Sequence, residues 1–424
     1  MADHAASAEA PQLVEHFFRH ESTHLVAVLT RAFGVRHLDL VEDTVQEALL
    51  TAMQVWSRRG VPKNPGGWIY RVARNRLLDA LRRRSTHQRL VEAIESPVDS
   101  GPALDDEWWY RDQVPDSLLR MLFVCAHPAL DRRSQIALTL KVLCGFSLAE
   151  IARGLLLTEE ATKKRVQRAR RRLAKAEVGV DLPPPDALDP RLAVVLEVLY
   201  LLFNEGYSTA AGDEPLRDDI CEEAARLCHV LCHHPRLGTA EARALLALML
   251  AHSARLDARL DSDGGTVLLA DQDRALWDRR LIAHAELWLA RSRTDAPSRY
   301  HYEAAISLTH CRAASIDATD WPHIVALYDR LLALHDSPLY VLNRAVARGE
   351  SGDVDTALAE LDSIRNRPEM RRYHLVDCAA GRLHELAGDR KAARRCYTSA
   401  RAQSTAPHEQ RLLDNRLTRL HGEC

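Results

Sequence analysis

Apolar residues recur at three- and four-residue intervals along most of the chain, a spacing that predicts amphipathic helices. Runs of β-branched residues are few, and Ala, Leu and Arg are abundant, so an all-α fold is expected. A compact helical block is expected from about residue 116 to residue 177. The other predicted helices are residues 13–32, 38–56, 68–84, 191–203, 218–233, 239–260 and 271–291.

The stretch from Ser147 to Leu173 has the clearest pattern. Ser147 and Glu150 form a capping box, and Thr158 is the N-cap candidate of the following helix. That helix has one stripe for burial: Thr162, Val166, Ala169 and Leu173. Its opposite face carries Lys163, Lys164, Gln167, Arg168 and Arg171. Two short helices with a tight turn, the second basic outside, are typical of a helix-turn-helix in the major groove. The alternative is an ordinary solvated basic helix.

Charge is unevenly distributed although the chain as a whole is close to neutral. Residues 1–180 contain 27 Lys and Arg against 22 Asp and Glu, whereas the remainder contains 30 against 37. The segment from Arg58 to Arg89 has ten basic residues and one acid, Asp79, which we expect to pair with a neighbouring arginine. A basic front and an acidic back indicate nucleic acid as a partner of the first part.

The second part follows a stiff spacer, Asp181-Leu-Pro-Pro-Pro-Asp186, which we expect to divide the chain in two. From residue 300 onward a helix-pair repeat emerges. Asp320, Asp353 and Asp389 each precede a predicted helix, and Gly352 and Gly388 mark the turns. Helix pairs that repeat near 34 residues are typical of tetratricopeptide arrays. The alternative is an ordinary helical bundle.

Residues 13–175 resemble a small sigma factor of the extracytoplasmic-function class, the subunit that lets bacterial RNA polymerase find and open promoters. Three stretches carry this resemblance: Val41-Glu-Asp-Thr-Val-Gln-Glu-Ala48, Asn64 to Arg84, and Glu150 to Leu173. Further stretches at Tyr200–Tyr207, Asp271–Asp278 and Asp320–Tyr328 are similar to a subgroup with a tetratricopeptide-like C-terminal extension. The resemblance implies two small helical domains at 10–92 and 116–178, an acidic linker at 93–115, a helical extension at 186–299 and repeats at 300–424.

The resemblance also implies three sets of functional residues. The set that binds core polymerase, at the β′ clamp helices, is Asp43, Gln46 and Glu47. The set that melts and reads the −10 element is Trp68, Arg71, Arg74, Asn75, Arg76, Arg82 and Arg83. The set that reads the −35 element is Ala161, Lys163, Lys164, Arg165, Gln167, Arg168 and Arg171. Trp68 has an alternative role as a core anchor. Leu156, Thr162 and Ala161 depart from the family pattern, so the bases that are read stay open.

The remaining patterns argue against a metal site. Cys221, Cys228 and Cys232 share one helix face, which favours packing over a zinc site, and Asp261-Ser-Asp-Gly-Gly265 is expected to be a turn.

We expect no enzyme activity, cofactor, metal or membrane span, and a cytoplasmic location. The expected partners are core polymerase, including its β flap, promoter DNA, and an intramolecular, protein or peptide partner of the C-terminal domain. The alternatives are a helix-turn-helix regulator with a tetratricopeptide sensor and a scaffold.

Overall fold

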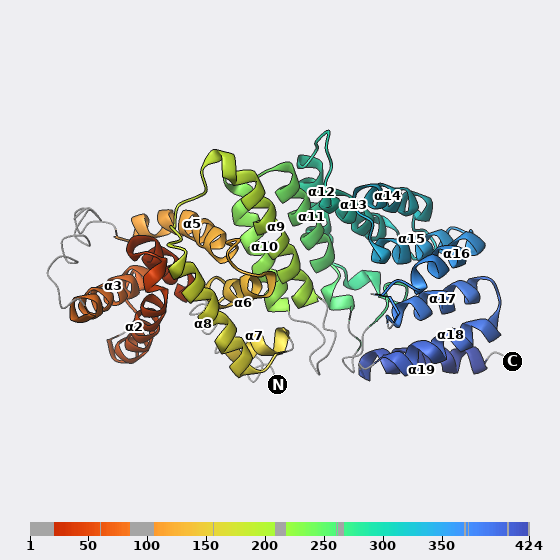
Figure 1. The fold of residues 1–424 in the computed structure, drawn as a ribbon, viewed down its shortest axis with the longest axis horizontal. Coiled ribbons are helices and arrows are strands. Elements are labelled where there is room, and N and C mark those ends of the chain that lie inside the picture. The colour runs from red at the N-terminus through yellow and green to blue at the C-terminus, as the bar shows by residue number, and fades with distance from the viewer. Residues whose placement is uncertain are drawn as a thin grey trace. The chain divides into compact units, whose positions relative to one another are not determined.

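A computed structural model of the chain describes residues 21–84 without 60, 106–207 without 156, 218–404 without 260, 262–266, 369 and 372, and 407–422. These residues form helices and connecting turns, in two compact units that span 1–202 and 203–424 (Figure 1). The all-α prediction is confirmed. None of the described helices combines the length and hydrophobicity needed to cross a bilayer.

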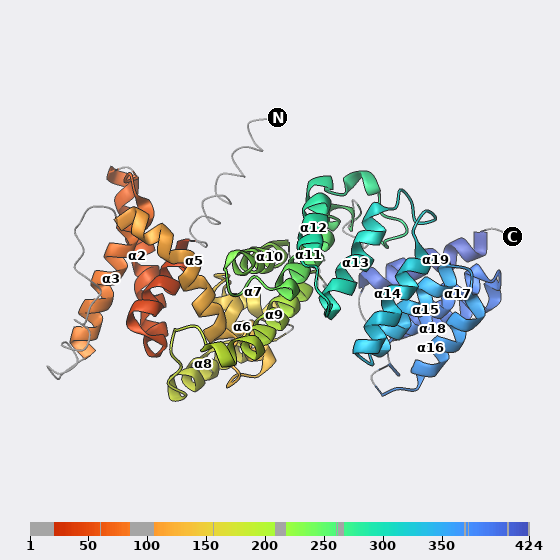
Figure 2. The same ribbon diagram turned by 90° about the horizontal axis from the view of Figure 1, so that it is seen from above.

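The first unit begins with a helix over residues 21–33 and the short turn η1 (Val35–His37). The predicted start of the first helix at residue 13 lies outside the described residues. Two long helices follow, α2 (Leu38–Arg59) and α3 (Pro65–Arg84), which pack side by side (Figures 1 and 2). Helix α3 starts three residues before the predicted Trp68, because Asn64 caps it: its Oδ1 accepts the Gly67 amide at 2.9 Å.

The helix-turn-helix block consists of α5 (Asp106–Cys125), α6 (Arg132–Val142), α7 (Leu148–Gly154) and α8 (Glu159–Lys175). The predicted start of this block at 116 is too late, since α5 begins at Asp106 and occupies the end of the expected acidic linker. The capping box is confirmed: the Glu150 carboxylate accepts the Ser147 amide at 2.6 Å, and the Ser147 hydroxyl accepts the Glu150 amide at 3.2 Å. Leu156 is outside the described residues.

Helix α8 has the predicted packing. Thr158 caps it by accepting the Ala161 amide at 3.2 Å. The four stripe residues are all buried: Thr162, Val166, Ala169 and Leu173. Burial of a threonine in this stripe is possible because its hydroxyl donates to the Thr158 carbonyl at 3.1 Å, so no polar group lacks a partner.

The boundary between the two units does not coincide with the proline-rich spacer. Helix α9 (Pro185–Tyr207) starts inside the spacer, and the boundary falls between Leu202 and Phe203, within this helix. The prediction that the spacer divides the chain was therefore wrong, and the helix predicted at 191–203 is longer at both ends. The first turns of α9 belong to the first unit, where Arg191 donates to the Phe123 carbonyl at 2.7 Å and Glu197 pairs with Arg132.

The second unit contains two 3₁₀ turns and ten further α-helices among its described residues, with the end of α9 (Figures 1 and 2). Its elements are α10 (Asp218–His233), α11 (Ala240–Ser253), η2 (Leu256–Ala258), η3 (Arg274–Leu276), α12 (Arg279–Arg291), α13 (Arg299–Arg312), α14 (Trp321–Leu334), α15 (Pro338–Glu350), α16 (Val354–Arg365), α17 (Leu375–Leu386), α18 (Arg390–Gln403) and α19 (Pro407–Gly422).

The segment that was predicted to be helical from Asp271 is a capped loop instead. Helix α12 begins only at Arg279, where the Asp278 carboxylate accepts two backbone amides at 2.7 and 3.1 Å. Arg274 donates to the carbonyls of His310 and Ala313 at 2.6 and 2.8 Å, and its guanidinium lies 4.4 Å from the buried Trp277 ring. These residues tie the loop to the end of α13, so hydrogen bonding rather than helix propensity decides its shape.

The helix-pair pattern from residue 300 is present in the structure. Asp320, Asp353 and Asp389 cap α14, α16 and α18 by accepting backbone amides at 3.0, 3.3 and 2.9 Å. Gly352 and Gly388 have φ of 102° and 76°, a conformation that glycine adopts without strain. The assignment of these pairs to the tetratricopeptide class stays a prediction.

Close helix packing makes one glycine of this region sensitive to substitution. A Cβ at Gly381 would lie 2.6–2.8 Å from the ring of Tyr397. The ring cannot move freely, because it is buried and its hydroxyl donates to Glu385 at 3.0 Å. Gly381→Ala should therefore lower the free energy of unfolding by about 1–3 kcal/mol, despite the better helix propensity of alanine. Urea unfolding of the full chain measures this loss.

A companion variant tests the cause of that loss. Tyr397→Leu in the Gly381→Ala background removes the clashing ring atoms, so the two substitutions should couple and the double variant should lose less stability than the sum of the singles. Additive losses would mean that Gly381 does not act through contact with Tyr397.

The three cysteines of α10 lie on its buried face, as predicted from their spacing. The Cys221 thiol lies 3.6 Å from the Phe203 carbonyl and the Cys228 thiol 3.6 Å from the Ala242 carbonyl. Burial raises the pKa of the Cys221 thiol. The pKa of the Cys228 thiol is also raised, first by its hydrogen bond with the adjacent Cys232 thiol and then by burial. No group of three or more His, Cys, Asp and Glu side chains suited to a metal is found in the described part of the chain.

Candidate polymerase and promoter interface

Helix α2 presents a mixed polar and apolar stripe to solvent. Asp43 and Gln46, both predicted to bind polymerase, are exposed on it. The same face continues with Leu50 and Met53, whose exposed fractions of 59% and 57% are among the largest of the apolar side chains. The spacing of these four residues, 43, 46, 50 and 53, keeps them on one side of a helix. Exposed apolar side chains beside acids are typical of a protein-binding surface.

The sequence analysis missed Leu50 and Met53 as surface residues. Their spacing also fits the apolar side of an amphipathic helix, and only the packing shows which side of α2 is covered. The buried side consists of Val41, Val45, Ala48 and Ala52, each fully enclosed.

Glu47 is connected to the helix that was predicted to melt DNA. Its carboxylate accepts a hydrogen bond from Arg76 at 2.7 Å, and Arg76 also donates to the Thr51 hydroxyl at 2.9 Å. This contact joins α2 to α3. Glu47 and Arg76, predicted for two different partners, are thus partners of each other in this structure.

Helix α3 carries the basic face predicted to contact the −10 element. Arg71, Asn75, Arg82 and Arg83 are exposed, and Arg74 is half-buried. Asp79 lies on the same face and pairs with Arg82 at 3.7 Å, as predicted, while Arg83 donates to the Asp79 carbonyl.

Trp68 lies in the first turn of α3. It is half-buried, and its ring centroid is 5.7 Å from that of Trp56 on α2, in a tilted arrangement. This aromatic pair anchors the start of α3 against the end of α2, which fits the alternative of a core anchor.

Helix α8 keeps most of its basic face free. Lys163, Lys164, Gln167, Arg168 and Arg171 are exposed, and Lys164 pairs with Glu160 of its own helix at 2.6 Å. Ala161 is half-buried at the helix start. The spacing places the five polar side chains on one side, opposite the buried stripe, where they could follow a phosphate backbone and reach base edges.

Arg165 differs from the other residues predicted to read the −35 element. It is half-buried and donates to the Asp131 carboxylate at 3.3 Å, and Arg172 lies 3.7 Å from the same carboxylate. Burial alone would raise the pKa of Asp131, but hydrogen bonds from Ser134 and the charge of Arg165 lower it. Arg165 therefore holds α8 against the start of α6 in this structure.

A contact that the sequence analysis did not predict joins α8 to α2. The guanidinium of Arg170 bridges two carboxylates near the start of α2, those of Asp39 and Glu42. The side chains of Arg170 and Glu42 are only 15% and 12% exposed. These residues lie about 130 positions apart in the sequence. No local pattern could have shown this contact, because it depends on how two separately patterned segments pack.

Arg170 and Lys141 are the cations that stabilise the buried carboxylate of Glu42. Burial raises the pKa of Glu42, while Arg170 and Lys141 act in the opposite direction. Burial and the charge of Glu42 also raise the pKa of the nearby Cys125 thiol to about 12. A buried carboxylate of this kind is stable only while its cation stays in place.

Comparison with known proteins identifies the family of this chain. The family models of Sigma-70 region 2 and Sigma-70 region 4 match residues 17–87 and 120–173, and a family of unknown function, DUF6596, matches residues 191–293. The chain is 37% identical over 415 residues to an uncharacterized protein of Rhizobium meliloti, covering 94% of this chain and 95% of that one. No solved structure matches the chain.

Two relatives that are named as sigma factors match about a third of the chain. The ECF RNA polymerase sigma factor SigF of Caulobacter vibrioides is 30% identical over 159 residues, which are 37% of this chain and 83% of the relative. The ECF RNA polymerase sigma factor SigL of Mycobacterium tuberculosis is 34% identical over 142 residues, 33% of this chain and 76% of the relative. The chain thus belongs to the extracytoplasmic-function class of the sigma-70 family, as an alternative sigma factor for transcription initiation with a C-terminal helical extension.

Proposed function

We propose that the three exposed faces have different binding functions in transcription initiation. The α2 stripe around Asp43 binds the core polymerase, the α3 face around Asn75 holds melted −10 DNA, and the α8 face around Arg168 reads the −35 element. The observation that carries this proposal is the exposure of all three faces on well-packed helices whose opposite sides are buried. Positive charge along α3 and α8 suits phosphate neutralisation, and an asparagine offers donors and acceptors to a base edge.

The second unit is proposed to regulate the first, either by contact with it or by binding a protein or peptide. Two features support this role. The second part of the sequence is acidic where the first is basic, and stacked helix pairs offer side chains from successive helices to a ligand. Because the units share one chain, any contact between them forms at high effective concentration.

In vitro transcription with core polymerase tests both proposals. The full chain is compared with a chain shortened after Tyr207, which keeps α9 whole. Promoter-dependent transcripts from at least one of the two are expected. Absence of such transcripts from both would contradict the role in initiation, and equal activity of both would contradict regulation by the second unit.

The exposed basic face of α8, which we propose reads the −35 element, gives a quantitative prediction. Arg168→Ala and Arg171→Ala each remove one exposed cation that has no ion pair among the described residues. Each should weaken promoter binding by the polymerase complex about 3- to 10-fold at low salt and reduce the slope of log affinity against log salt by about one. Fluorescence anisotropy at several salt concentrations measures both quantities.

Lys391→Ala is the matched control, since Lys391 is an exposed cation of the second unit. It should leave promoter binding unchanged. If Arg168→Ala and Arg171→Ala changed neither affinity nor salt slope, the outer face of α8 would not be the DNA-binding surface.

A second candidate function is a helix-turn-helix regulator with a tetratricopeptide sensor that contacts polymerase weakly. The free basic face of α8 would serve both functions. The exposed stripe on α2 favours the sigma factor, because a regulator of this kind does not need it.

A further inference from the structure

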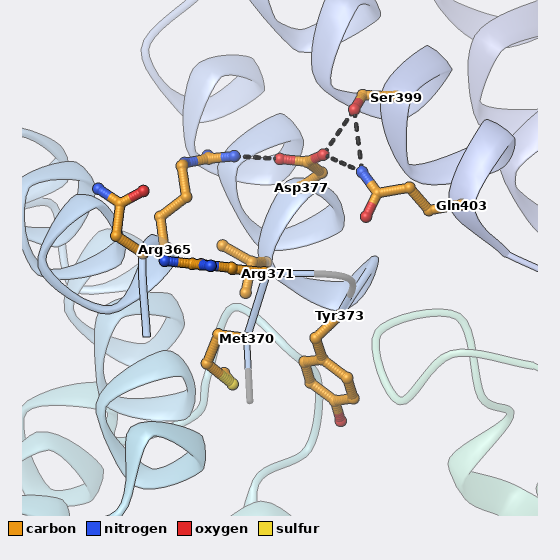
Figure 3. Close-up of a pocket in the computed structure, with 9 residues that line it drawn as sticks. Arg365, Met370, Arg371, Tyr373, Asp377, Ser399 and Gln403 are labelled. Carbon is orange, nitrogen blue, oxygen red and sulfur yellow. Dashed lines mark hydrogen bonds and ion pairs between the residues drawn. The ribbon is translucent and has the colours of Figure 1, made fainter. Parts of the chain in front are cut away.

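The second unit contains a cavity of about 530 Å³ that none of the proposed roles uses (Figure 3). It lies where the end of α16, the connector to α17, the start of α17 and the end of α18 meet. Its lining is mostly polar: Arg365, Asn366, Met370, Arg371, Tyr373, Val376, Asp377, Ser399 and Gln403. Cavities of this volume are typical of sites for small molecules or short chain ends.

One buried carboxylate organises the polar wall of this cavity. Asp377 is 7% exposed and accepts hydrogen bonds from three side chains: Arg365, Ser399 at 2.7 Å and Gln403 at 2.8 Å (Figure 3). Both of its oxygens are therefore occupied, and Arg365 neutralises its charge. Donors from α16 and α18 thus converge on one acceptor of α17, and the neutralised carboxylate does not repel an anion.

Several polar groups of the lining keep unused hydrogen-bonding capacity. Within the described residues, Arg371 has no carboxylate partner, and in Figure 3 its side chain extends in the direction of Arg365 and away from Tyr373. Gln403 uses its amide nitrogen on Asp377 and Ser399, which leaves its amide oxygen as an acceptor. The Tyr373 hydroxyl can donate and accept hydrogen bonds, and burial, with Glu409 nearby, raises its pKa further above neutrality.

The free groups define the chemistry of a matching ligand. An unpaired guanidinium calls for an anion, and a planar carboxylate can accept two of its N–H groups at once. The Gln403 amide oxygen can accept a hydrogen bond from a donor of the ligand, such as an amide N–H. Met370 and Val376 are buried and supply an apolar floor for a side chain. A phosphate ion could pair with the guanidinium and donate an O–H to the Gln403 oxygen, but it has no apolar part to cover Met370 and Val376.

We propose that this cavity binds an acylated amino acid, whose carboxylate meets Arg371, whose amide N–H donates to Gln403 and whose side chain rests on Met370 and Val376. The same chemistry occurs in a free N-acyl amino acid and in the last residue of a peptide. The inference rests on the proposed regulatory role of the second unit and gives that role a ligand.

Binding is measured on the full chain by isothermal titration calorimetry with four probes: N-acetyl-leucine, a short peptide ending in leucine with a free carboxylate, the same peptide with an amidated end, and inorganic phosphate. The free-carboxylate peptide, the N-acetyl amino acid or both should bind, and the amidated peptide should not. Tighter binding of the peptide would identify a chain end as the source, and equal binding would identify a small molecule.

Arg371→Ala should raise the Kd of the bound probe about 10- to 100-fold, the loss expected for a charge-assisted hydrogen bond. Folding should not suffer, because Arg371 is exposed and has no ion pair among the described residues. Arg371→Lys should retain part of the affinity. The control, Arg394→Ala, removes an exposed cation of α18 outside the lining and should leave the Kd unchanged.

The proposal is overturned if neither carboxylate probe binds, or if the amidated peptide binds as tightly as the free-carboxylate peptide. It is also overturned if phosphate is the only probe whose binding depends on Arg371. These outcomes are separate from those of the transcription assay. Normal transcription without binding would remove only the ligand site, whereas binding without promoter-dependent transcription would remove only the role in initiation.

Discussion

Asp43→Lys is expected to abolish stable binding of this sigma factor to core RNA polymerase, with a loss of affinity of at least about 30-fold. Asp43 is exposed in the α2 stripe and has no ion pair in the part of the chain that the structure describes. Reversal of its charge therefore changes the surface and not the fold. A lysine at this place would face a partner surface that accepts an acid, and like charges at an interface cost several kcal/mol.

Position 43 is a better test than position 47. Glu47→Lys would also place a cation beside Arg76, whose hydrogen bond to Glu47 joins α2 to α3, and would mix lost binding with lost stability. Asp355→Lys is the control, since Asp355 is an exposed acid of α16. Co-migration with core polymerase in gel filtration and the affinity by fluorescence titration measure the effect. Unchanged affinity in Asp43→Lys would show that the α2 stripe around Asp43 is not the surface that binds core polymerase.

Arg170→Met is expected to open the contact between α8 and α2. The substitution leaves Glu42 buried without its cation, a loss of about 3–5 kcal/mol for a broken buried pair. The first unit can avoid this cost by separating the two helices, so that water reaches Glu42. Energy transfer between dyes on exposed sites of α2 and α8 should decrease, while helix content by circular dichroism should stay the same.

The double variant Glu42→Gln with Arg170→Met tests whether the contact opens because of the unpaired charge of Glu42 or because of the altered side-chain packing. Both charges are then absent, so the contact should close again at least in part. In Arg170→Met alone, the closed form holds Glu42 at a raised pKa and therefore binds more protons than the open form, so closure should recover as the pH falls. High energy transfer in Arg170→Met at every pH would show that Arg170 does not hold the two helices together.

Local patterns in the sequence predicted the helices and their caps well. The capping box of Ser147 and Glu150 and the cap at Thr158 are confirmed, and three aspartates of the second unit precede helices as predicted, because each feature depends on residues at most three positions apart. The buried stripe of α8 is confirmed for the same reason. Family membership followed from three such stretches in their order along the chain.

Long-range features could not be predicted in this way. The bridge from Arg170 to Glu42, the pairing of Glu47 with Arg76 and the network around Asp377 join residues whose spacing has no period. Arg165 looked like its basic neighbours in the sequence, and only the position of Asp131 distinguishes it. The start of α12 was predicted too early because the hydrogen bonds of Asp278 and Arg274 outweigh a helical pattern. The roles of the predicted site residues stay predictions.

Helix α9 limits how such a protein can be assembled from parts. Its start belongs to the first unit through Arg191 and Glu197, and its end belongs to the second, where the Tyr207 ring lies 4.7 Å from that of His252. A fusion that adds such an extension to a shorter sigma factor has to keep residues 185–207 intact. A chimaera joined at the spacer or at residue 191 would instead place a foreign helix in one of two cores, so exchange of extensions between relatives should succeed only when the whole helix moves with its neighbours.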